Sequence, residues 1–269
     1  MIVPIEPLTS VFVLALGLVL GSFLNVCIYR LPLGDSVVHP RSRCPSCEAP
    51  ISWYQNVPVI SWIVLRGRCA RCEARISVRY PVVELVSGLS LLALWLVFGP
   101  GPAFPIASFF ALSMLALFFT DYDHQLLPDA ITLTGLAVGL AISWFNPFLD
   151  GTGWRRVWLS AAGAVIGSGL LWGFGALYGK LRGVEAMGMG DVKMMAMVGA
   201  FAGPFGVLLT IFGGSIVGAL FGILMIPLKG RSLQDTLPFG CFLAPAAMGA
   251  LLFSRHVWIA YSSVLFPPP

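Results

Sequence analysis

Residues 8–29 read LTSVFVLALGLVLGSFLNVCIY, an apolar stretch without a charged side chain. A helix needs about 20 such residues to cross the hydrocarbon core of a bilayer, which is about 30 Å thick. Hydrocarbon offers no partners to backbone N–H and C=O groups, so a helix must satisfy them internally. The stretch therefore predicts a transmembrane helix. Glu6 before it and Arg30 after it reverse the charge order of a cleavable signal peptide.

Seven further stretches are apolar, although the sixth and eighth of the whole set are of uncertain length. They lie at residues 81–99, 103–120, 130–149, 157–179, 192–203, 205–227 and 239–253. Charged residues make up 10% of the chain and hydrophobic residues 58%, whereas about a quarter of a soluble domain is charged. So few charges exclude a soluble enzyme, a nucleic-acid-binding protein and a disordered chain. The sequence predicts an all-α polytopic membrane protein with about eight transmembrane helices.

Lysine and arginine are unevenly distributed among the connecting segments. With residues 31–80 in the cytoplasm, 13 of the 16 basic residues lie on that side, and only Arg155, Arg156 and Arg255 lie outside. Cytoplasmic loops of membrane proteins carry such an excess of positive charge. The pattern predicts an external amino terminus and an even number of spans. It also explains the net charge of +4 without a nucleic-acid partner.

The polar segment at residues 31–80 contains an internal repeat with four of the six cysteines. RSRCPSCEAPIS at residues 41–52 and RGRCARCEARIS at residues 66–77 share eight of twelve positions. Each copy supplies one CxxC pair, and two such turns complete a tetrahedron of thiolates around Zn²⁺. The sequence predicts a closed, structural zinc site in a small cytoplasmic domain. Its ligands are Cys44, Cys47, Cys69 and Cys72.

The sequence also allows two other roles for the cysteines. Disulfides compete with zinc, but the predicted cytoplasmic side is reducing. A redox-active dithiol also competes, although it needs only one pair. The arginines around the cysteines fit either contacts with anionic headgroups or a simple topology signal.

Acidic side chains near the predicted helix ends are candidates for function, because ionisable groups at a bilayer are costly. Asp121 and Asp191 both fall on the predicted cytoplasmic side, so they can meet. Two carboxylates in close contact share a proton, and one then acts as a base on water while the other donates to a substrate carbonyl. This arrangement predicts aspartic proteolysis. The alternative is that such aspartates only cap helices.

Neighbouring residues could support such a pair. Gly188 and Gly190 precede Asp191 and leave room for a substrate backbone, because glycine has no β-carbon. Asp129 could cap the helix that follows it, and Lys193 either stabilises a carboxylate or only marks the cytoplasmic side. Further titratable candidates are Glu84, to which no role is assigned, and Asp123 and His124, for which an ordinary solvated or hydrogen-bonding role is the simpler interpretation.

Several motifs together resemble the bacterial type IV prepilin peptidases, also called leader peptidase–N-methyltransferases. The match runs nearly from end to end and is specific as a set. Its motifs are GSFLNV at residues 21–26, YRLP at 29–32, ISWYQNVP at 51–58, RYP at 79–81 with Glu84, Asp121 with HQLLPD at 124–129, GMGDVK at 188–193 and PFG at 238–240.

The resemblance implies a GxGD-type membrane aspartyl endopeptidase in the bacterial inner membrane, with Asp121 and Asp191 as its catalytic pair. Members cleave leader peptides from type IV prepilins and type II secretion pseudopilins on the cytoplasmic side. Many then methylate the new amino terminus with S-adenosylmethionine, but no residue of this sequence marks a cofactor site. The implied division is a first helix (1–30), a zinc-binding domain (31–80) and a peptidase domain (81–269).

Some features depart from the family pattern, and other functions compete. The cysteine loop is short, and Glu48 and Glu73 stand where zinc knuckles commonly carry glycine. A zinc-dependent membrane docking protein of a pilus or secretion system, without peptidase activity, is the main alternative. A transporter is disfavoured because the acids lie at one face rather than at the midplane. The oligomeric state and the particular pilin substrate stay open.

Overall fold

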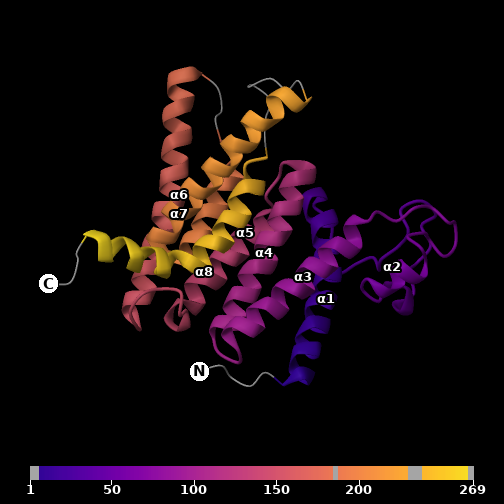
Figure 1. The fold of residues 1–269 in the computed structure, drawn as a ribbon. Helices are drawn as coiled ribbons and strands as arrows, with labels where there is room; N and C mark the ends of the chain where they lie inside the picture. Colours follow the sequence, from indigo (N-terminus) through magenta and orange to yellow (C-terminus); the bar gives the residue numbers. More distant parts are fainter. Residues whose placement is uncertain (1–5, 184–186, 230–237, 266–269) are drawn as a thin grey trace. The chain divides into compact units, whose positions relative to one another are not determined.

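The computed structural model describes residues 6–183, 187–229 and 238–265 and is drawn as a ribbon in Figure 1. Within these residues the named elements are all helices, and two isolated β-bridges are the remaining pairings. By its internal contacts the chain divides into two compact units, Met1–Ala116 and Leu117–Pro269. The all-α class predicted from the sequence is confirmed.

The first unit is built on two helices, α1 (Pro7–Arg30) and α3 (Arg79–Phe98). They approach closely at small residues, since a β-carbon at Gly17 would lie 2.7 Å from the Cα atom of Gly88. Small residues let membrane helices pack backbone against backbone in this way. Nearer the loop, Nδ2 of the buried Asn25 donates to the carbonyl of Tyr80 at 3.1 Å.

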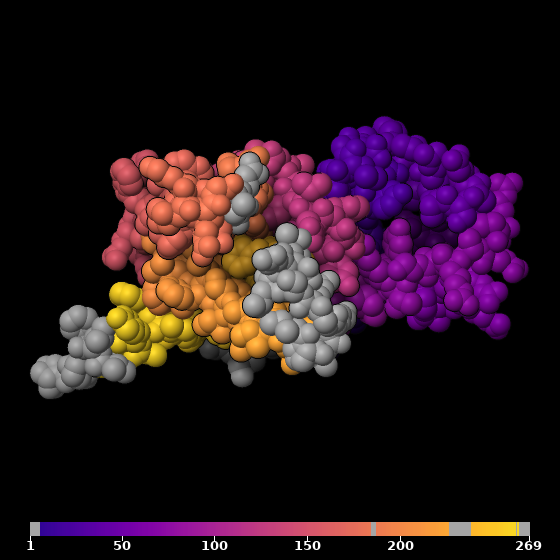
Figure 2. All heavy atoms as spheres, turned by 90° about the horizontal axis from the view of Figure 1, so that it is seen from above, coloured from indigo at the N-terminus to yellow at the C-terminus, as the bar shows by residue number. Residues whose placement is uncertain are grey.

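The loop between these helices contains three short helices, η1 (Leu31–Leu33), η2 (Trp53–Asn56) and α2 (Ile60–Val64). A buried carboxylate anchors it, because Oε2 of Glu84 on α3 accepts the N–H of Val59 at 2.8 Å. The Ser22 hydroxyl of α1 also hydrogen-bonds Glu84. In Figure 2 the atoms of α1 and of the following loop, in indigo and purple, form one contiguous body. Glu84 thus has a structural role in this unit.

The second unit contains the end of α4 (Ala103–His124), then α5 (Asp129–Ile142), η3 (Ser143–Phe145), α6 (Trp154–Arg182), α7 (Met189–Lys229) and α8 (Gly240–Leu265). Helices α6 and α7 pack against each other at glycines, with Gly163 against the backbone of Gly199. The Ser160 hydroxyl then donates to the carbonyl of Ala200 at 2.7 Å. This close packing fixes the first half of α7, which carries Asp191.

Among the described residues, six helices are long and apolar enough to cross a membrane: α1, α3, α4, α6, α7 and α8. Residues 129–145 form a shorter apolar helix. The eight expected segments all correspond to helical structure, but the sixth and seventh share α7, a 41-residue element. At Gly203 the backbone leaves the helical conformation (φ 70°, ψ −178°), and Pro204 after it lacks an N–H. The expected count of eight spans is therefore approximate.

Candidate active site and metal centre

Asp121 lies in the last turn of α4, and its side chain is only 5% exposed. The backbone N–H of Cys241, in the first turn of α8, donates to Oδ2 of Asp121 at 2.9 Å. The first N–H groups of a helix have no partner within the helix, and the helix dipole favours negative charge there. The start of α8 therefore orients the Asp121 carboxylate.

Gly240, the first residue of α8, leaves the space that this carboxylate occupies. A β-carbon at residue 240 would lie 2.8 Å from Oδ2 and 3.0 Å from Cγ of Asp121. In the sequence, Gly240 belongs to the PFG motif at residues 238–240, but nothing there predicts a role for it. A glycine directly before an apolar stretch is too common in this chain to single out one position.

Asp191 lies in the first turn of α7, directly after Gly188 and Gly190. Its backbone N–H donates to the carbonyl of Gly188 at 3.2 Å. Its carboxylate is near enough to Asp121 for the two charges to interact electrostatically. The structure thus brings together two carboxylates from the ends of separate helices, α4 and α7.

Leu127 lies among the elements that carry this pair, and sequence reasoning missed it. The residue is 8% exposed, in the short segment between α4 and α5. A β-carbon at Gly190 would lie 3.0 Å from Cβ of Leu127, and one at Gly240 would lie 3.2 Å from its Cδ2. Both glycines therefore pack against one leucine, which holds the starts of α7 and α8 at a fixed spacing.

Lys193 and Asp129 form an ion pair beside the aspartates. The Nζ atom of Lys193 lies 2.7 Å from both carboxylate oxygens of Asp129. The expectation that Asp129 caps its helix is wrong, because Pro128 occupies the N-cap position and Asp129 lies within the first turn of α5. A carboxylate in the first turn still interacts favourably with the helix dipole. The pair joins the start of α5 to the start of α7.

The remaining titratable candidates from the sequence are Asp123, His124 and Glu84. Asp123 and His124 are exposed in the last turn of α4. Glu84 lies in the first unit and anchors the loop at Val59, as described above. Of the acids that the sequence offered, Asp191 is thus the one whose charge interacts directly with that of Asp121.

The four repeat cysteines converge in the first unit, and their sulfur atoms all lie within 4.8 Å of one another. The two copies of the repeat have the same backbone geometry. The N–H of Cys44 donates to the carbonyl of Ala49 at 3.0 Å, and the N–H of Cys69 donates to Ala74 at 2.9 Å. Four sulfurs at this spacing could bind one metal ion, as the tetrahedral sites of zinc proteins do.

Glu48 and Glu73 adopt the left-handed conformation that explains the usual glycine at these positions. Their φ values are 54° and 57°, a region that costs a residue with a β-carbon about 1–2 kcal/mol. Each turn nevertheless closes, since the N–H of each glutamate donates to the carbonyl of the first cysteine in its pair, at 2.9 and 3.0 Å. Glutamate in place of glycine therefore raises the backbone strain of each turn but does not change the shape of the turn.

The thiols in this cluster have unequal proton affinities. The backbone N–H groups of Cys47 and Ser46 point at the Cys44 sulfur and lower its pKa to about 6. The pKa of Cys72 is raised to about 12, because the neighbouring sulfurs of Cys47, Cys69 and Cys44 outweigh the lowering effect of the Ala74 N–H. Four sulfurs this close together can all be thiolates only beside a cation, which is the property of a metal site.

Comparison with known proteins identifies the family. A model of the bacterial peptidase A24 N-terminal domain matches residues 15–98, and the type IV leader peptidase family model matches residues 108–223. A Stutzerimonas stutzeri protein named prepilin leader peptidase/N-methyltransferase is 37% identical over 92% of both chains. The chain belongs to the type IV leader peptidase family.

Other relatives of the family carry the same name. A Pseudomonas putida protein is 36% identical over 93% of this chain and 92% of its own length. An Aeromonas hydrophila protein is 35% identical over 90% of this chain and 89% of its own. No solved structure gives a significant match. The leader peptidase family match includes Asp121 and Asp191 but ends before Gly240 and Cys241, so the residues that orient Asp121 lie outside it.

Proposed function

We propose that this chain is a membrane aspartyl endopeptidase that removes leader peptides from type IV prepilins and type II secretion pseudopilins. We further propose that it methylates the new amino terminus of the product. The observation that carries the proposal is the pair of carboxylates, Asp121 and Asp191, on two helix ends in a chain of the type IV leader peptidase family. Residues 81–269 form the peptidase part and residues 31–80 the metal-binding part of this assignment.

In the proposed mechanism the two aspartates share one proton. One carboxylate takes a proton from a water molecule, whose oxygen attacks the scissile carbonyl carbon, while the other donates its proton to the carbonyl oxygen. The C–N bond then breaks, and the leaving amine takes up a proton. The Cys241 N–H at 2.9 Å keeps the Asp121 carboxylate in one orientation through these steps. Fixed geometry of this kind lowers the barrier because little reorganisation is left to occur.

The neighbouring residues position the catalytic aspartates and leave room for the substrate. Gly188 and Gly190 carry no side chains, which leaves room for an extended substrate beside Asp191. The ion pair between Lys193 and Asp129 holds the start of α7 against α5 and thus positions Asp191, two residues before Lys193. Neither residue of the pair needs to contact the scissile bond in this proposal.

The proposed metal is zinc, held by Cys44, Cys47, Cys69 and Cys72. Four protein thiolates leave no open coordination position, so its role is structural. The proposed orientation has this domain in the reducing cytoplasm, the amino terminus outside, and the aspartates at the cytoplasmic face of the bacterial inner membrane. Prepilin leaders are basic and precede an apolar helix, so they emerge on that side.

The methyl donor of the proposed second activity is S-adenosylmethionine, whose sulfonium supplies an electrophilic methyl group. The printed name of the relatives, prepilin leader peptidase/N-methyltransferase, supports this activity.

The proposal is tested by incubating the purified full-length protein in detergent with a prepilin and S-adenosylmethionine, followed by intact-mass spectrometry. Loss of the leader supports the peptidase, and an added methyl group on the product supports the second activity. Zinc-loaded, folded protein that leaves every tested pilin uncut would favour a docking role for the cysteine domain instead.

A further inference from the structure

The short helix α2, in the loop between α1 and α3, has an exposed apolar face. Ile60, Ile63 and Val64 are 61%, 63% and 72% exposed, and residues at positions i, i+3 and i+4 share one face of a helix. Ser61 and Trp62 face the loop instead, where their hydroxyl and indole N–H groups donate to backbone carbonyls at 2.9 and 3.2 Å. A helix at a surface in water carries its polar side chains outside, so α2 has the reverse pattern.

The start of α2 lies beside a membrane-spanning part of α1. Oε2 of Glu84 accepts the N–H of Val59 at 2.8 Å, and the Ser22 hydroxyl hydrogen-bonds the same carboxylate. Ser22 precedes Arg30, the last residue of α1, by eight positions, which corresponds to about 12 Å along a helix. The start of α2 is therefore level with the apolar part of α1, where the acyl chains of a bilayer lie, rather than beyond the end of that helix.

The backbone N–H groups of residues 57–61 have partners inside the protein. The N–H of Val57 donates to the Ser61 hydroxyl at 3.1 Å, and the N–H of Ser61 donates to the Val57 carbonyl at 3.0 Å. The N–H of Ile60 donates to the carbonyl of Pro58, which has no N–H of its own, at 2.6 Å. A segment that contacts lipid must satisfy its backbone internally, because hydrocarbon offers no partners. This turn meets that condition.

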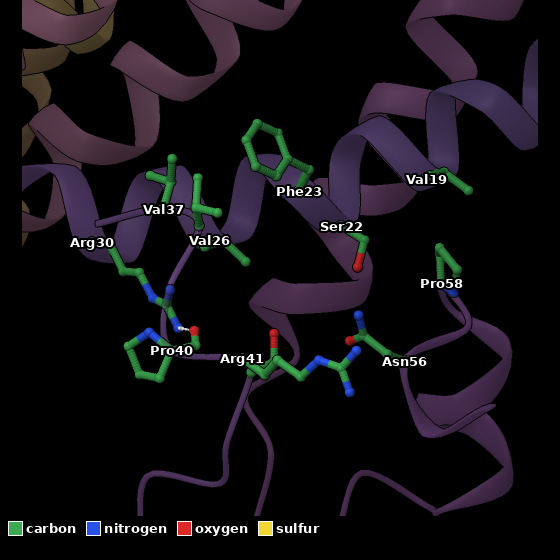
Figure 3. Close-up of a pocket in the computed structure, with 12 residues that line it drawn as sticks. Val19, Ser22, Phe23, Val26, Arg30, Val37, Pro40, Arg41, Asn56 and Pro58 are labelled. Atoms are coloured by element: carbon green, nitrogen blue, oxygen red, sulfur yellow. Dashed lines mark hydrogen bonds between the residues drawn. The ribbon is translucent and has the colours of Figure 1, made fainter. Parts of the chain in front are cut away.

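An open groove of about 380 Å³ adjoins the turn, between the second half of α1 and the loop (Figure 3). Its lining includes Val19, Phe23 and Val26 of α1 and Pro58 of the turn. It also includes two arginines, and no aspartate or glutamate is among its lining residues. The groove thus combines an apolar wall on a membrane helix with an excess of positive charge.

Of the two arginines, Arg41 is available to a ligand. The guanidinium of Arg30 already donates to the carbonyls of residues 36 and 40, at 2.9 and 2.8 Å. Figure 3 shows Arg41 extending toward Asn56 on the opposite segment, and among the described residues its side chain has no hydrogen-bond or ion-pair partner. A guanidinium binds phosphate oxygens through parallel N–H···O bonds. Phosphate joined to an acyl chain is the chemistry of an anionic phospholipid.

We propose that α2 inserts its apolar face among the acyl chains of the bilayer, and that the adjoining groove binds an anionic phospholipid of the same leaflet. The phosphate binds Arg41, and an acyl chain lies along the apolar residues of α1. A lipid suits this surface better than the substrate does, because the basic leader of a prepilin would be repelled by the arginines. The loop domain is then attached to the membrane surface as well as tethered by α1 and α3.

Photocrosslinking tests the contact of α2 with lipid. Full-length protein carrying Ile63→p-benzoylphenylalanine is irradiated in nanodiscs that contain phosphatidylglycerol, and its intact mass is measured. The same substitution at Phe12, which is 66% exposed on α1, is the positive control, and at Glu48, which is 78% exposed in the cysteine domain, the negative control. We expect position 63 to gain the mass of one phospholipid, as position 12 does, at least tenfold more often than position 48.

Three results of the crosslinking would overturn the insertion of α2. Lipid adducts no more frequent at position 63 than at position 48 would place α2 in water. An adduct with a second copy of the protein would identify an interface between copies. An adduct with an added prepilin in place of lipid would identify a substrate surface.

A matched pair of variants tests the groove. Arg43 lies two residues after Arg41, is equally basic, and faces Glu48 at 3.9 Å outside the groove. Native mass spectrometry measures the phosphatidylglycerol and phosphatidylcholine that Arg41→Ala and Arg43→Ala retain in detergent, with zinc content as the check on folding. We expect Arg41→Ala to retain at least fivefold less phosphatidylglycerol than the wild type, and Arg43→Ala to stay within twofold.

The groove site would be overturned by unchanged retention in Arg41→Ala, or by a wild type that retains both lipids equally. Displacement of the lipid by inorganic phosphate would show a phosphate site that does not bind the acyl chain. Neither measurement involves leader cleavage or methylation, so the failure of this inference is distinct from failure of the proposed function.

Discussion

Gly240 and Asp121 are packed so closely that a β-carbon at residue 240 would lie 2.8 Å from Oδ2 of the aspartate. The same oxygen accepts the N–H of Cys241 at 2.9 Å. A glycine at this position is therefore a condition for the hydrogen bond. The backbone at the start of α8, rather than any side chain of α8, determines how Asp121 is oriented.

The first prediction concerns this contact. Gly240→Ala should lower cleavage at least 100-fold, because the added methyl group displaces the Asp121 carboxylate. Gly249→Ala is the matched control in the same helix, since a β-carbon there meets no atom within 4 Å. Initial rates of leader removal measure both variants. Equal rates for the two would contradict the proposed role of Gly240.

A companion pair of variants separates the backbone of Cys241 from its thiol. Cys241→Pro removes the N–H that binds Asp121 at a helix position where proline is tolerated, and we expect a loss of cleavage at least tenfold. Cys241→Ala keeps the N–H and should lose no more than about threefold. If alanine is as damaging as proline, the thiol rather than the N–H is what matters.

The ion pair of Lys193 with Asp129 should contribute modestly to stability. Both side chains are partly exposed, 32% and 55%, and ion pairs in such settings contribute about 0.2–1 kcal/mol. A double-mutant cycle with Asp129→Asn and Lys193→Met, followed by thermal unfolding in detergent, measures the coupling. A positioning role predicts a lower kcat with little change in KM. A change confined to KM would instead indicate direct contact with the substrate.

Zinc affinity should rise with pH. The pKa of Cys72 is raised to about 12, so this thiol is protonated at neutral pH without metal and must lose its proton to bind zinc. Each proton released when the metal binds increases the apparent affinity about tenfold per pH unit, so we expect a slope of at least tenfold per unit between pH 6 and 8. Competition with a chelator measures this slope. An affinity that does not change with pH would refute thiol ligation at Cys72.

Glycine at the strained turn positions should stabilise the cysteine domain. Glu73→Gly relieves the left-handed conformation at φ 57°, which costs about 1–2 kcal/mol. Glycine adds an entropy cost of about 0.5–1 kcal/mol, so we expect a net gain of about 0.5–1 kcal/mol. The ion pair lost with Arg68 is long, at 3.8 Å, and largely exposed, so it offsets little. Glu73→Ala loses the same ion pair but keeps the strain. Equal stability of the glycine and alanine variants, measured by thermal unfolding, would argue against strain at this turn.

The sequence predicts the fold class, the four-cysteine cluster and the pairing of Asp121 with Asp191, each for a specific reason. A CxxC pair repeated at an offset of 25 residues, Cys44 to Cys69, constrains geometry locally, and the structure brings the four sulfurs together. Asp121 and Asp191 could be matched because each ends or begins an apolar segment on the same predicted side.

Other features depend on packing that the sequence does not encode locally. Leu127 is one leucine among many, and its contact with both Gly190 and Gly240 exists only once three helices have assembled. The break in α7 at Gly203, where φ is 70°, by contrast falls between the sixth and seventh segments expected from the sequence, residues 192–203 and 205–227. Asp129 looked like a cap, but Lys193, far away in sequence, binds its carboxylate.

The most direct test of the central claim is cleavage of a prepilin by purified Asp121→Asn and Asp191→Asn proteins, beside Asp123→Asn as a control from the same turn as Asp121. Asparagine keeps the size of the side chain but cannot share or transfer the proton. We expect leader removal, followed by intact mass, to fall at least 1,000-fold in the first two variants and to stay within threefold in the control. Near-wild-type cleavage by either of the first two would contradict the assignment of Asp121 and Asp191 as the catalytic pair.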